Sequence, residues 1–236
     1  MSKQEKIVSM FNDIAGTYDL ANRVLSMGID KSWRDKACNL AYSFYGKDTV
    51  SKIVDVACGT GDMIDYWQKT AGKNGINLEQ VVGVDPSVGM MEVAKKKLPD
   101  VEFIEAGAAQ MPLDSDSADV ISISYGIRNV VQRQEAFDEF ARVLKKDGLV
   151  VILEFTKNKK EKPLDYVTDF YMNKILPTLG GMISRNKEAY TYLPNSIDEF
   201  LTQDNLCAEL RQAGLEPIYV KGFSMNISTL FIARKI

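Results

Sequence analysis

The stretch Ile53-Val54-Asp55-Val56-Ala57-Cys58-Gly59-Thr60-Gly61-Asp62 decides the fold of this chain. Its first four residues include three β-branched side chains, which is typical of a buried parallel strand. The glycines Gly59 and Gly61 then permit a tight turn and a close approach of the backbone to a ligand. Residues 63–71 have a composition that suits a helix. A glycine turn between a strand and a helix predicts a nucleotide-binding site.

The residues around the two glycines indicate the kind of nucleotide. A dinucleotide site needs a Gly or Ala three residues after the second glycine, where this chain has Ile64. Asp62 at the start of the helix would repel a phosphate, whereas Asp55 and Asp62 suit a cationic ligand. S-adenosylmethionine carries a sulfonium and an ammonium and no phosphate. The stretch resembles the first motif of class I methyltransferases, so we expect this cofactor beside Asp55, Gly59 and Gly61.

A second short strand is expected over residues 80–85, and it ends in Asp85. Asp85 lies 24 residues after Gly61, close to the spacing at which an acid holds the ribose hydroxyls of a nucleotide. Ser87 is expected to cap the helix that follows. The alternative for Asp85 is a solvated acid at the start of that helix. The combination of strand, spacing and glycine turn favours ribose binding.

Small residues follow the next two predicted strands. Gly107 and Ala108 come after the strand expected over residues 101–105, and they leave room for a flat ring such as adenine. Ser124 ends the strand expected over residues 118–124. In open parallel sheets, ligands bind at the carboxyl ends of the strands. We therefore expect these positions to lie together with the glycine turn in one site.

Strands and helices alternate for about a hundred residues, which predicts a parallel sheet with right-handed crossovers. Two β-rich segments, 218–223 and 228–233, are expected to close the sheet as an antiparallel hairpin. We expect residues 1–46 to form an N-terminal helical region. The Rossmann-like domain is expected over residues 47–236, with a helical insertion at about 157–200.

The N-terminal region carries apolar residues at helical spacing. The pattern predicts an amphipathic helix over residues 3–14 that is broken at residues 15–19, and a second helix that Ser32 caps and Gly46 ends. Packing against the domain is one explanation for the first helix. The alternative is a lid over the substrate, to which Tyr18 would contribute a polar contact.

The insertion has two features that the sequence leaves open. The basic run 157–162 suits either a solvated loop or contact with an anionic membrane surface, because an apolar stripe follows it over residues 164–175. That stripe could cover an apolar substrate or simply complete the fold. After residues 190–194 we expect a helix that begins at Asn195 or Ser196.

Composition narrows the classes of function and location. With 45% apolar and 26% charged residues the chain is typical of a globular protein. A net charge of −3 makes nucleic acid a poor candidate partner. Three cysteines without CxxC spacing and no signal-like start predict a cytoplasmic, reducing compartment, with peripheral contact at the inner face of the membrane as an option. The sequence does not fix the oligomeric state, and a homodimer is one option.

The chain contains no histidine. A Ser-His-Asp triad, a His-ligated zinc and a histidine general base are therefore excluded, and we expect no metal site. Proton transfer must use a carboxylate, Tyr, Lys, water or the acidity of the substrate itself.

Several blocks together resemble the ubiquinone/menaquinone biosynthesis C-methyltransferase family (UbiE type). They are Met10-Phe11-Asn12-Asp13-Ile14-Ala15-Gly16-Thr17-Tyr18-Asp19, the positions Asn22, Leu25-Ser26-Met27-Gly28 and Trp33-Arg34, then Tyr125-Gly126-Ile127-Arg128-Asn129-Val130, Glu154-Phe155 and Tyr192-Leu193-Pro194-Asn195-Ser196-Ile197. The resemblance spans nearly the whole chain. It implies a class I α/β fold, Rossmann-like, with a seven-stranded and mostly parallel sheet, helices on both faces and an N-terminal helical lid.

The resemblance also implies which residues bind the cofactor. Carried over by position, contacts to S-adenosylmethionine fall on Thr60, Asp85, Gly107, Ala108 and Ser124. Many family members have Asn where this chain has Gly107, so only a backbone contact is expected there.

The family's reaction is methylation of a ring carbon on a reduced, prenylated quinone. Because Arg128 follows the strand expected over residues 118–124, our hypothesis is that it stabilises the forming ring oxyanion, directly or through an activated water. Asn129 would orient the ring hydroxyl, and Tyr18 would assist from the lid. An ion pair with an acid at the end of a strand is the structural alternative for Arg128. Demethylmenaquinol is the favoured substrate, and the alternative is the 2-polyprenyl-6-methoxy-1,4-benzoquinol precursor of ubiquinone or another small molecule.

Two rival functions come from other classes. An NAD-dependent oxidoreductase is disfavoured by Ile64 and by the lack of a recognisable proton donor. A catalytically silent module that binds S-adenosylmethionine and works through partners would share the glycine turn. Titration with NADH separates the first from a methyltransferase, and a methyl-transfer assay separates the second.

Overall fold

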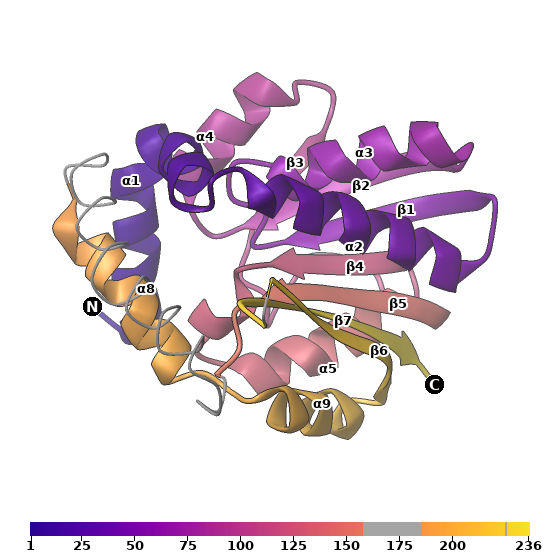
Figure 1. Cartoon of the computed structure of the whole chain (residues 1–236). Helices are drawn as coiled ribbons and strands as arrows, with labels where there is room; N and C mark the ends of the chain where they lie inside the picture. The colour runs from indigo at the N-terminus through magenta and orange to yellow at the C-terminus, as the bar shows by residue number, and fades with distance from the viewer. Residues whose placement is uncertain (158–185, 225) are drawn as a thin grey trace.

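The computed structural model describes residues 1–157, 186–224 and 226–236. Within them a seven-stranded sheet has the order β3-β2-β1-β4-β5-β7-β6 (Figure 1). The strands are β1 (Thr49–Val56), β2 (Asn77–Asp85), β3 (Glu102–Glu105), β4 (Ala118–Ser124), β5 (Leu144–Glu154), β6 (Leu215–Phe223) and β7 (Ser228–Lys235). Neighbours among β1 to β5 are parallel, and β7 lies antiparallel between β5 and β6. The predicted class I α/β sheet and its closing hairpin are confirmed.

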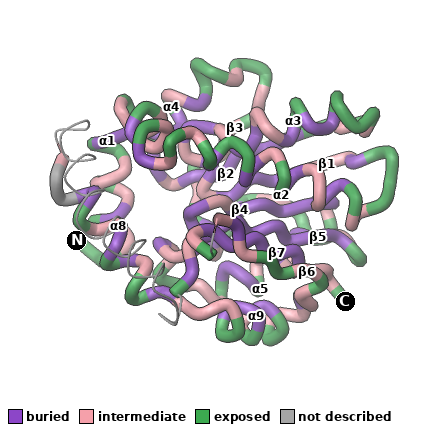
Figure 2. The backbone as a smooth tube through the Cα atoms, viewed as in Figure 1, coloured by how far each residue is buried: buried purple, intermediate pink, exposed green. Residues whose placement is uncertain are grey.

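Helices cover both faces of this sheet. They are α1 (Lys3–Leu25), α2 (Ile29–Tyr45), α3 (Asp62–Asn74), α4 (Val88–Lys97), the short 3-10 helix η1 (Ile127–Asn129), α5 (Arg133–Val143), α8 (Lys187–Asp198) and α9 (Gln203–Gln212). One core packs α2 and α3 on the sheet, and the other packs α5 and α9. Figure 2 shows the central strands as the buried layer, with exposed residues on the outer sides of the helices.

Alternation along the central strands divides side chains between these two cores. Val54 and Val56 of β1 face α5 and α9, whereas Ile53 faces α2 and α3. Asp55 has the same parity as Ile53, and it therefore lies under α2 and α3. Its carboxylate is buried there beside Ser122 of β4.

The turn between β1 and α3 needs glycine for two different reasons. Gly59 and Gly61 both have left-handed backbone conformations, with φ of 54° and 81°. A Cβ on Gly59 would meet no atom within 4 Å, so the turn is open to a ligand at that position. A Cβ on Gly61 would lie 2.8 Å from Cδ1 of Leu98. Gly61 therefore also lets α3 begin close to the end of α4.

The predicted break in the first helix is wrong. α1 runs without interruption from Lys3 to Leu25, through Gly16. Its buried side continues past the expected break, with Ala21 and Leu25 inside. Gly16 is exposed and a Cβ there would meet nothing, so this glycine neither bends the helix nor serves a close contact. Burial of the apolar face outweighs the roughly 1 kcal/mol that one glycine costs a helix.

The predicted start of the second helix is also wrong. α2 begins at Ile29 after Gly28, which has φ of 75°, and Ser32 is exposed on the first turn. The left-handed Met27 and Gly28 reverse the chain between α1 and α2. The predicted end at Gly46 is confirmed. Ser32 therefore does not cap this helix, because the backbone of Met27 and Gly28 makes the turn that precedes it.

The helix expected to begin at Asn195 or Ser196 begins earlier. α8 starts at Lys187, where the Asn186 side chain accepts from the Ala189 N–H at 3.1 Å, and it contains Pro194. Proline removes one hydrogen bond from a helix, and tertiary packing can outweigh that loss. Here Ala189, Tyr190 and Leu193 pack against α1. The predicted apolar stripe over 164–175 and most of the basic run 157–162 lie outside the described residues.

None of the helices in the described ranges has the length and apolar character needed to cross a membrane.

Candidate active site

A cavity opens at the carboxyl ends of β1, β2 and β4, and α1 forms its outer wall. It holds about 910 Å³ of atom-free space, counting its open mouth. Its lining includes these sequence-predicted residues: Tyr18, Gly59, Asp85, Gly107, Ala108, Ser124 and Asn129. The others, Asp55, Thr60, Gly61 and Arg128, lie in or beside the elements that build the cavity. The strand-end positions therefore do meet in one place.

Asp85 is held rigidly at the end of β2. Its Oδ2 accepts from the Gly59 N–H at 2.8 Å, and its Oδ1 accepts from the Ser87 N–H at 2.7 Å. Burial raises the pKa of this carboxyl to about 6. Each oxygen keeps a second lone pair, so the carboxylate can still accept from ligand hydroxyls.

Ser87 links this acid to α1, and sequence reasoning assigned it only a capping role. It does cap α4, because its Oγ accepts from the Met90 N–H. Its hydroxyl also donates to Oδ1 of Asn12 on α1 at 2.8 Å, and the Gly89 N–H donates to the same oxygen at 2.8 Å. The wall of the cavity is thus hydrogen-bonded to the loop that carries Asp85.

Small residues line the cavity just beyond β3, the strand beside β2. A Cβ on Gly107 would meet no atom within 4 Å, so this side is open. Ala108 is buried beside it. Ala57 and Tyr125, which also line the cavity, have left-handed φ angles of 49° and 57°. Non-glycine residues in this conformation store backbone strain and concentrate at ligand sites.

The α1 wall is apolar and aromatic. Ile7, Val8, Phe11 and Tyr18 face the cavity. The Phe11 and Tyr18 rings meet edge to face with centroids 6.1 Å apart. Burial raises the pKa of Tyr18, while a hydrogen bond to Asn22 and the charge of Arg128 oppose that rise. Tyr18 is therefore a neutral phenol, and the charge of Arg128 acts on it.

Arg128 makes the ion pair that the sequence left as an alternative. Its Nη1 donates to Oε1 of Glu154 at 2.6 Å and to the Tyr125 carbonyl at 2.7 Å. Its Nε donates to Oγ of Ser196 at 3.3 Å, and its guanidinium lies over the Phe155 ring at 5.5 Å. Burial raises the pKa of Glu154, and the charge of Arg128 opposes the shift. Sequence reasoning named Glu154 only as part of a motif, because the pairing joins residues 26 positions apart.

Asn129 faces the cavity from the adjacent position of η1. The hydroxyl of Tyr192 on α8 donates to its Oδ1 at 3.0 Å. Because Ser196 also bonds to Arg128, α8 is tied to two of the three predicted catalytic residues. Tyr192 was part of a matching motif, but no local pattern in the sequence pointed to this contact.

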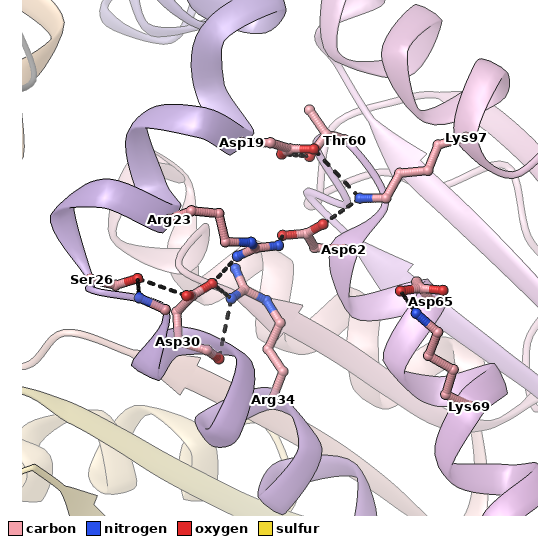
Figure 3. A network of polar contacts seen from close by, with 11 residues as sticks. Asp19, Arg23, Ser26, Asp30, Arg34, Thr60, Asp62, Asp65, Lys69 and Lys97 are labelled. Carbon is pink, nitrogen blue, oxygen red and sulfur yellow. Dashed lines mark hydrogen bonds and ion pairs between the residues drawn. The ribbon is translucent and has the colours of Figure 1, made fainter. Parts of the chain in front are cut away.

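Thr60 and Asp62 point to the N-terminal helices rather than into the cavity. Thr60 Oγ1 donates to Oδ1 of Asp19 at 2.5 Å (Figure 3). Asp62 forms ion pairs with Arg23 of α1 and Lys97 of α4. Although burial acts to raise it, the pKa of Asp62 is lowered by the surrounding cations. Asp62, one of the two acids expected to favour a cationic ligand, is therefore already paired with cations of the chain itself.

The residues fit S-adenosylmethionine. Asp85 can accept hydrogen bonds from ribose hydroxyls, and the open side at Gly107 and Ala108 can take a flat ring. Among the described residues of the lining, Asp85 is the one charged side chain. The lining therefore has no cationic side chain among its described residues that could bind a phosphate. A positively charged ligand without phosphates fits such a cavity.

Comparisons with solved structures define the class of protein. A methyltransferase dependent on S-adenosylmethionine from Thermotoga maritima has a TM-score of 0.63 at 18% identity, covering 98% of this chain and all of that one. Another from Aquifex aeolicus has a TM-score of 0.55 at 16% identity, covering 79% and 82%. The fold is that of the class I methyltransferases.

Sequence comparisons define the family. The model of the ubiE/COQ5 methyltransferase family matches residues 1–235. The ubiquinone/menaquinone biosynthesis C-methyltransferase UbiE of Campylobacter jejuni strain RM1221 is 56% identical over 236 residues, all of both chains. The demethylmenaquinone methyltransferase of Chlorobaculum tepidum is 36% identical over 234 residues, 98% of this chain and 93% of the relative. The chain belongs to the ubiE/COQ5 methyltransferase family, and the resemblance seen in its motifs is confirmed.

Proposed function

We propose that this protein methylates a ring carbon of demethylmenaquinol, the reduced prenylated naphthoquinone, and so forms menaquinol in menaquinone biosynthesis. The observation that carries the proposal is the cavity itself: a ribose-type acid at one end, an apolar wall from α1, and Asn129 with the neighbouring Arg128 at the other side. The name of the Chlorobaculum tepidum relative supports the naphthoquinol. The Campylobacter jejuni relative carries both quinone names, so the benzoquinol precursor of ubiquinone is the alternative.

S-adenosylmethionine, when bound, supplies the methyl group from its sulfonium. We assign its adenosine to Asp85, Gly107, Ala108 and Ser124, and we place its remaining contacts around Asp55, Gly59, Thr60 and Gly61. Gly59 contributes an open backbone position, and Gly61 sets the start of α3. These assignments follow from the strand ends that the residues occupy and from the groups they can offer.

The protein's part in catalysis is to align the quinol ring and to favour its oxyanion. In this proposal the positive charge of Arg128 stabilises the ring oxygen as the hydroxyl loses its proton, directly or through a water molecule. Asn129, fixed by Tyr192, orients the hydroxyl. Tyr18 contacts the ring from α1 as a neutral phenol, since its pKa is raised by burial.

We further propose that residues 1–46 act as a lid on the domain formed by 47–236. α1 forms one wall of the cavity, and its hydrogen bonds to Ser87, Gly89 and Thr60 tie it to the loops around the cofactor site. A prenylated substrate dissolves in lipid, so we place the protein in the cytoplasm with peripheral contact at the inner face of the membrane.

The decisive assay supplies labelled S-adenosylmethionine with each reduced ring system in turn. Demethylmenaquinol and the 2-polyprenyl-6-methoxy-1,4-benzoquinol would carry the same prenyl tail in detergent, under a reductant. We expect label in menaquinol, with a kcat/KM at least about tenfold above that for the benzoquinol, since tenfold corresponds to about 1.4 kcal/mol of transition-state discrimination. A preference for the benzoquinol would reverse the substrate assignment. Label in neither product would refute the quinol proposal while leaving the cofactor unaffected.

A further inference from the structure

Exposed apolar side chains are concentrated where α1 turns into α2. Leu20 and Val24 lie near the end of α1, Met27 lies in the turn, and Ile29 begins α2. Met27 is 85% exposed and Leu20 is 60% exposed. Elsewhere in the described ranges, exposed large apolar residues occur singly or, on β6, as a pair. We call these four residues the α1–α2 patch, since clustered exposed apolar residues mark interaction sites.

The members of the patch follow one another along one side of α1. Leu20 and Val24 are four positions apart, so they are neighbours on the helix surface. The Met27 N–H donates to the Val24 carbonyl at 3.1 Å, which keeps Met27 beside the end of the helix. Tyr18 faces the cavity, and residues two positions apart point to different sides of a helix. α1 therefore presents the cavity wall on one side and the patch on another.

The turn satisfies its own backbone N–H groups. Those of residues 26–29 all donate to carbonyls of the same turn or of α1. The Ser26 hydroxyl accepts from the Gly28 N–H at 3.2 Å and donates to Oδ1 of Asp30 at 2.7 Å, and Arg23 pairs with the same acid (Figure 3). A segment can enter an apolar phase at low cost only when its backbone donors are bonded internally. These donors of the turn meet that condition.

The charges beside the patch suit an anionic surface. Between residues 14 and 36, the exposed charged side chains are Lys31 and Lys36. The acids of this stretch are all held in ion pairs: Asp19 with Lys97, Asp30 with Arg23 and Arg34, and Asp35 with Lys73. The whole chain has a net charge of −3, so the two exposed lysines give this part of the surface the opposite sign.

We infer that the α1–α2 patch inserts into the surface of a lipid bilayer that contains anionic lipids, with Lys31 and Lys36 against the headgroups. Apolar side chains flanked by lysines are the combination with which helices bind at the membrane interface. A second copy of the chain fits less well, because a symmetric contact would bring the same lysines of both copies together. The inference rests on the proposed lipid-soluble substrate, since α1 would then join the bilayer surface to the cavity.

The test measures cosedimentation with vesicles of phosphatidylcholine and phosphatidylglycerol. The double variant Leu20→Gln/Met27→Asn removes two apolar side chains from the patch. Glutamine suits a helix, and asparagine suits the left-handed φ of 51° at position 27, so the fold should be kept. We expect the partition coefficient to fall at least about tenfold, which corresponds to about 1.4 kcal/mol. In Ile218→Thr/Val220→Thr, the matched control on β6, binding should stay within about twofold.

The lysines are tested separately. Lys31→Gln and Lys36→Gln should each weaken binding to the mixed vesicles about fivefold, which corresponds to about 1 kcal/mol per lysine near an anionic surface. Binding to vesicles of phosphatidylcholine alone should change less than about twofold. Lys146→Gln, an exposed lysine of β5, is the control and should bind like the wild type. Equal effects of the three substitutions would contradict headgroup contact at Lys31 and Lys36.

A tryptophan on the patch reports insertion directly. The native Trp33 and Trp67 are buried, so the added fluorescence of Leu20→Trp should shift to the blue when vesicles are mixed in, and that of Val220→Trp should not. The sedimentation coefficient of the protein without lipid is measured alongside. Unchanged vesicle binding in the double variant would overturn the inference. Vesicle binding lost together with a change from dimer to monomer would instead assign the patch to a contact between copies.

A methyl-transfer assay separates this inference from the proposed function. With quinol dispersed in detergent, Leu20→Gln/Met27→Asn should turn over like the wild type, whereas with quinol in vesicles it should be slower. Equal loss in detergent and in vesicles would contradict a role at the membrane. If the wild type methylated neither quinol, the proposed function would fail, and the cosedimentation and fluorescence would still test the patch.

Discussion

Nη1 of Arg128 lies 2.6 Å from Oε1 of Glu154, and this carboxylate is fully buried at the end of β5. The Arg128 backbone N–H donates to the other oxygen, Oε2, at 3.3 Å. The side chain and main chain of one residue therefore clamp a single acid. This clamp fixes η1 against the sheet, which in turn fixes Asn129 on the cavity wall.

Replacing Arg128 with Gln separates catalysis from cofactor binding. We expect kcat to fall at least about a hundredfold, as when a residue that stabilises an oxyanion is removed. Affinity for S-adenosylhomocysteine should stay within about twofold, because Arg128 lies outside the proposed adenosine contacts. The free energy of unfolding should fall by about 3–5 kcal/mol, since Glu154 loses its buried partner. Methyl transfer, calorimetry and urea unfolding measure the three quantities.

Arg133→Gln is the matched control for that variant. Arg133 pairs with Glu209 at 2.6 Å and lies over the Phe200 ring at 5.5 Å, the same kind of arrangement as Arg128 with Glu154 and Phe155. Arg133 joins α5 to α9 and does not itself line the cavity, so we expect turnover close to that of the wild type. Equal losses of turnover and cofactor affinity in Arg128→Gln would assign Arg128 a structural role only.

Removing the contacts of Asn12 should loosen α1. In Asn12→Ala the hydroxyl of Ser87 and the N–H of Gly89 lose their shared acceptor. Each hydrogen bond contributes about 1 kcal/mol, so losing both should make local opening of α1 roughly thirtyfold more frequent. Hydrogen exchange should then be faster over residues 3–25 and unchanged over residues 133–143. Asp13→Ala, an exposed neighbour on the same helix, is the control, and similar exchange in both variants would count against docking through Asn12.

Cofactor affinity should depend on pH through two buried carboxyls. Burial raises the pKa of Asp85 to about 6 and that of Asp55 to about 7. Both acids must be ionised to accept hydrogen bonds from a ligand, so affinity is lost as the pH falls and binding releases protons. A carboxyl with a pKa of about 6 is ionised to about a tenth at pH 5, which weakens a ligand that needs it about tenfold. The groups acting on the Asp55 carboxyl are the Ser122 hydroxyl from β4 and the charges of Arg34 from α2, Asp85 from β2 and Asp62 from α3.

Two ligands separate the two acids: 5′-methylthioadenosine carries the adenosine and a thioether, and S-adenosylhomocysteine carries the amino-acid end as well. Affinity for 5′-methylthioadenosine should titrate once, near pH 6, and that for S-adenosylhomocysteine should show a further step near pH 7 that disappears in Asp55→Asn. The stability of the ligand-free protein should depend on pH in the opposite direction: it should fall as the pH rises. Because both pKa values are raised by folding, these carboxyls contribute most below pH 4, and that contribution is lost as the pH rises through 6 to 7. Urea unfolding across this range measures it, and identical titrations for both ligands would contradict the assignment.

Two glycines of the site should respond differently to alanine. Gly61→Ala places a Cβ 2.8 Å from Leu98 and puts a side chain on a residue with φ of 81°. We therefore expect the free energy of unfolding to fall by about 1–3 kcal/mol. Gly107→Ala meets no atom within 4 Å and has no left-handed φ, so stability should be unchanged or slightly higher. Urea unfolding of both variants tests the difference. A large loss in Gly107→Ala would show that this side of the cavity is not open.

Much of the fold could be predicted from local patterns in the sequence. β4 and the helix after Asp85 lie within a residue or two of their expected places, because β-branched runs and a serine cap are properties of adjacent residues. β1 ends where expected, at Val56, but begins at Thr49, four residues before the expected start. The same patterns placed Gly59, Asp85, Gly107 and Ser124 at strand ends. The parallel sheet then brings those ends together, which is why these residues meet at one cavity.

The sequence by itself determined the sheet, the glycine turn and the class of cofactor, since each depends on residue types at short spacing. Only the tertiary structure decided the partners: Glu154 for Arg128, Tyr192 for Asn129, and the placement of Arg34 over Tyr125. The tertiary structure also decided the length of α1, because burial against α4 and α8 outweighs the cost of Gly16 in the helix. The physical reason is the same in each case. Burial and charge pairing act between residues far apart in the chain, and only the folded packing brings those residues within contact distance.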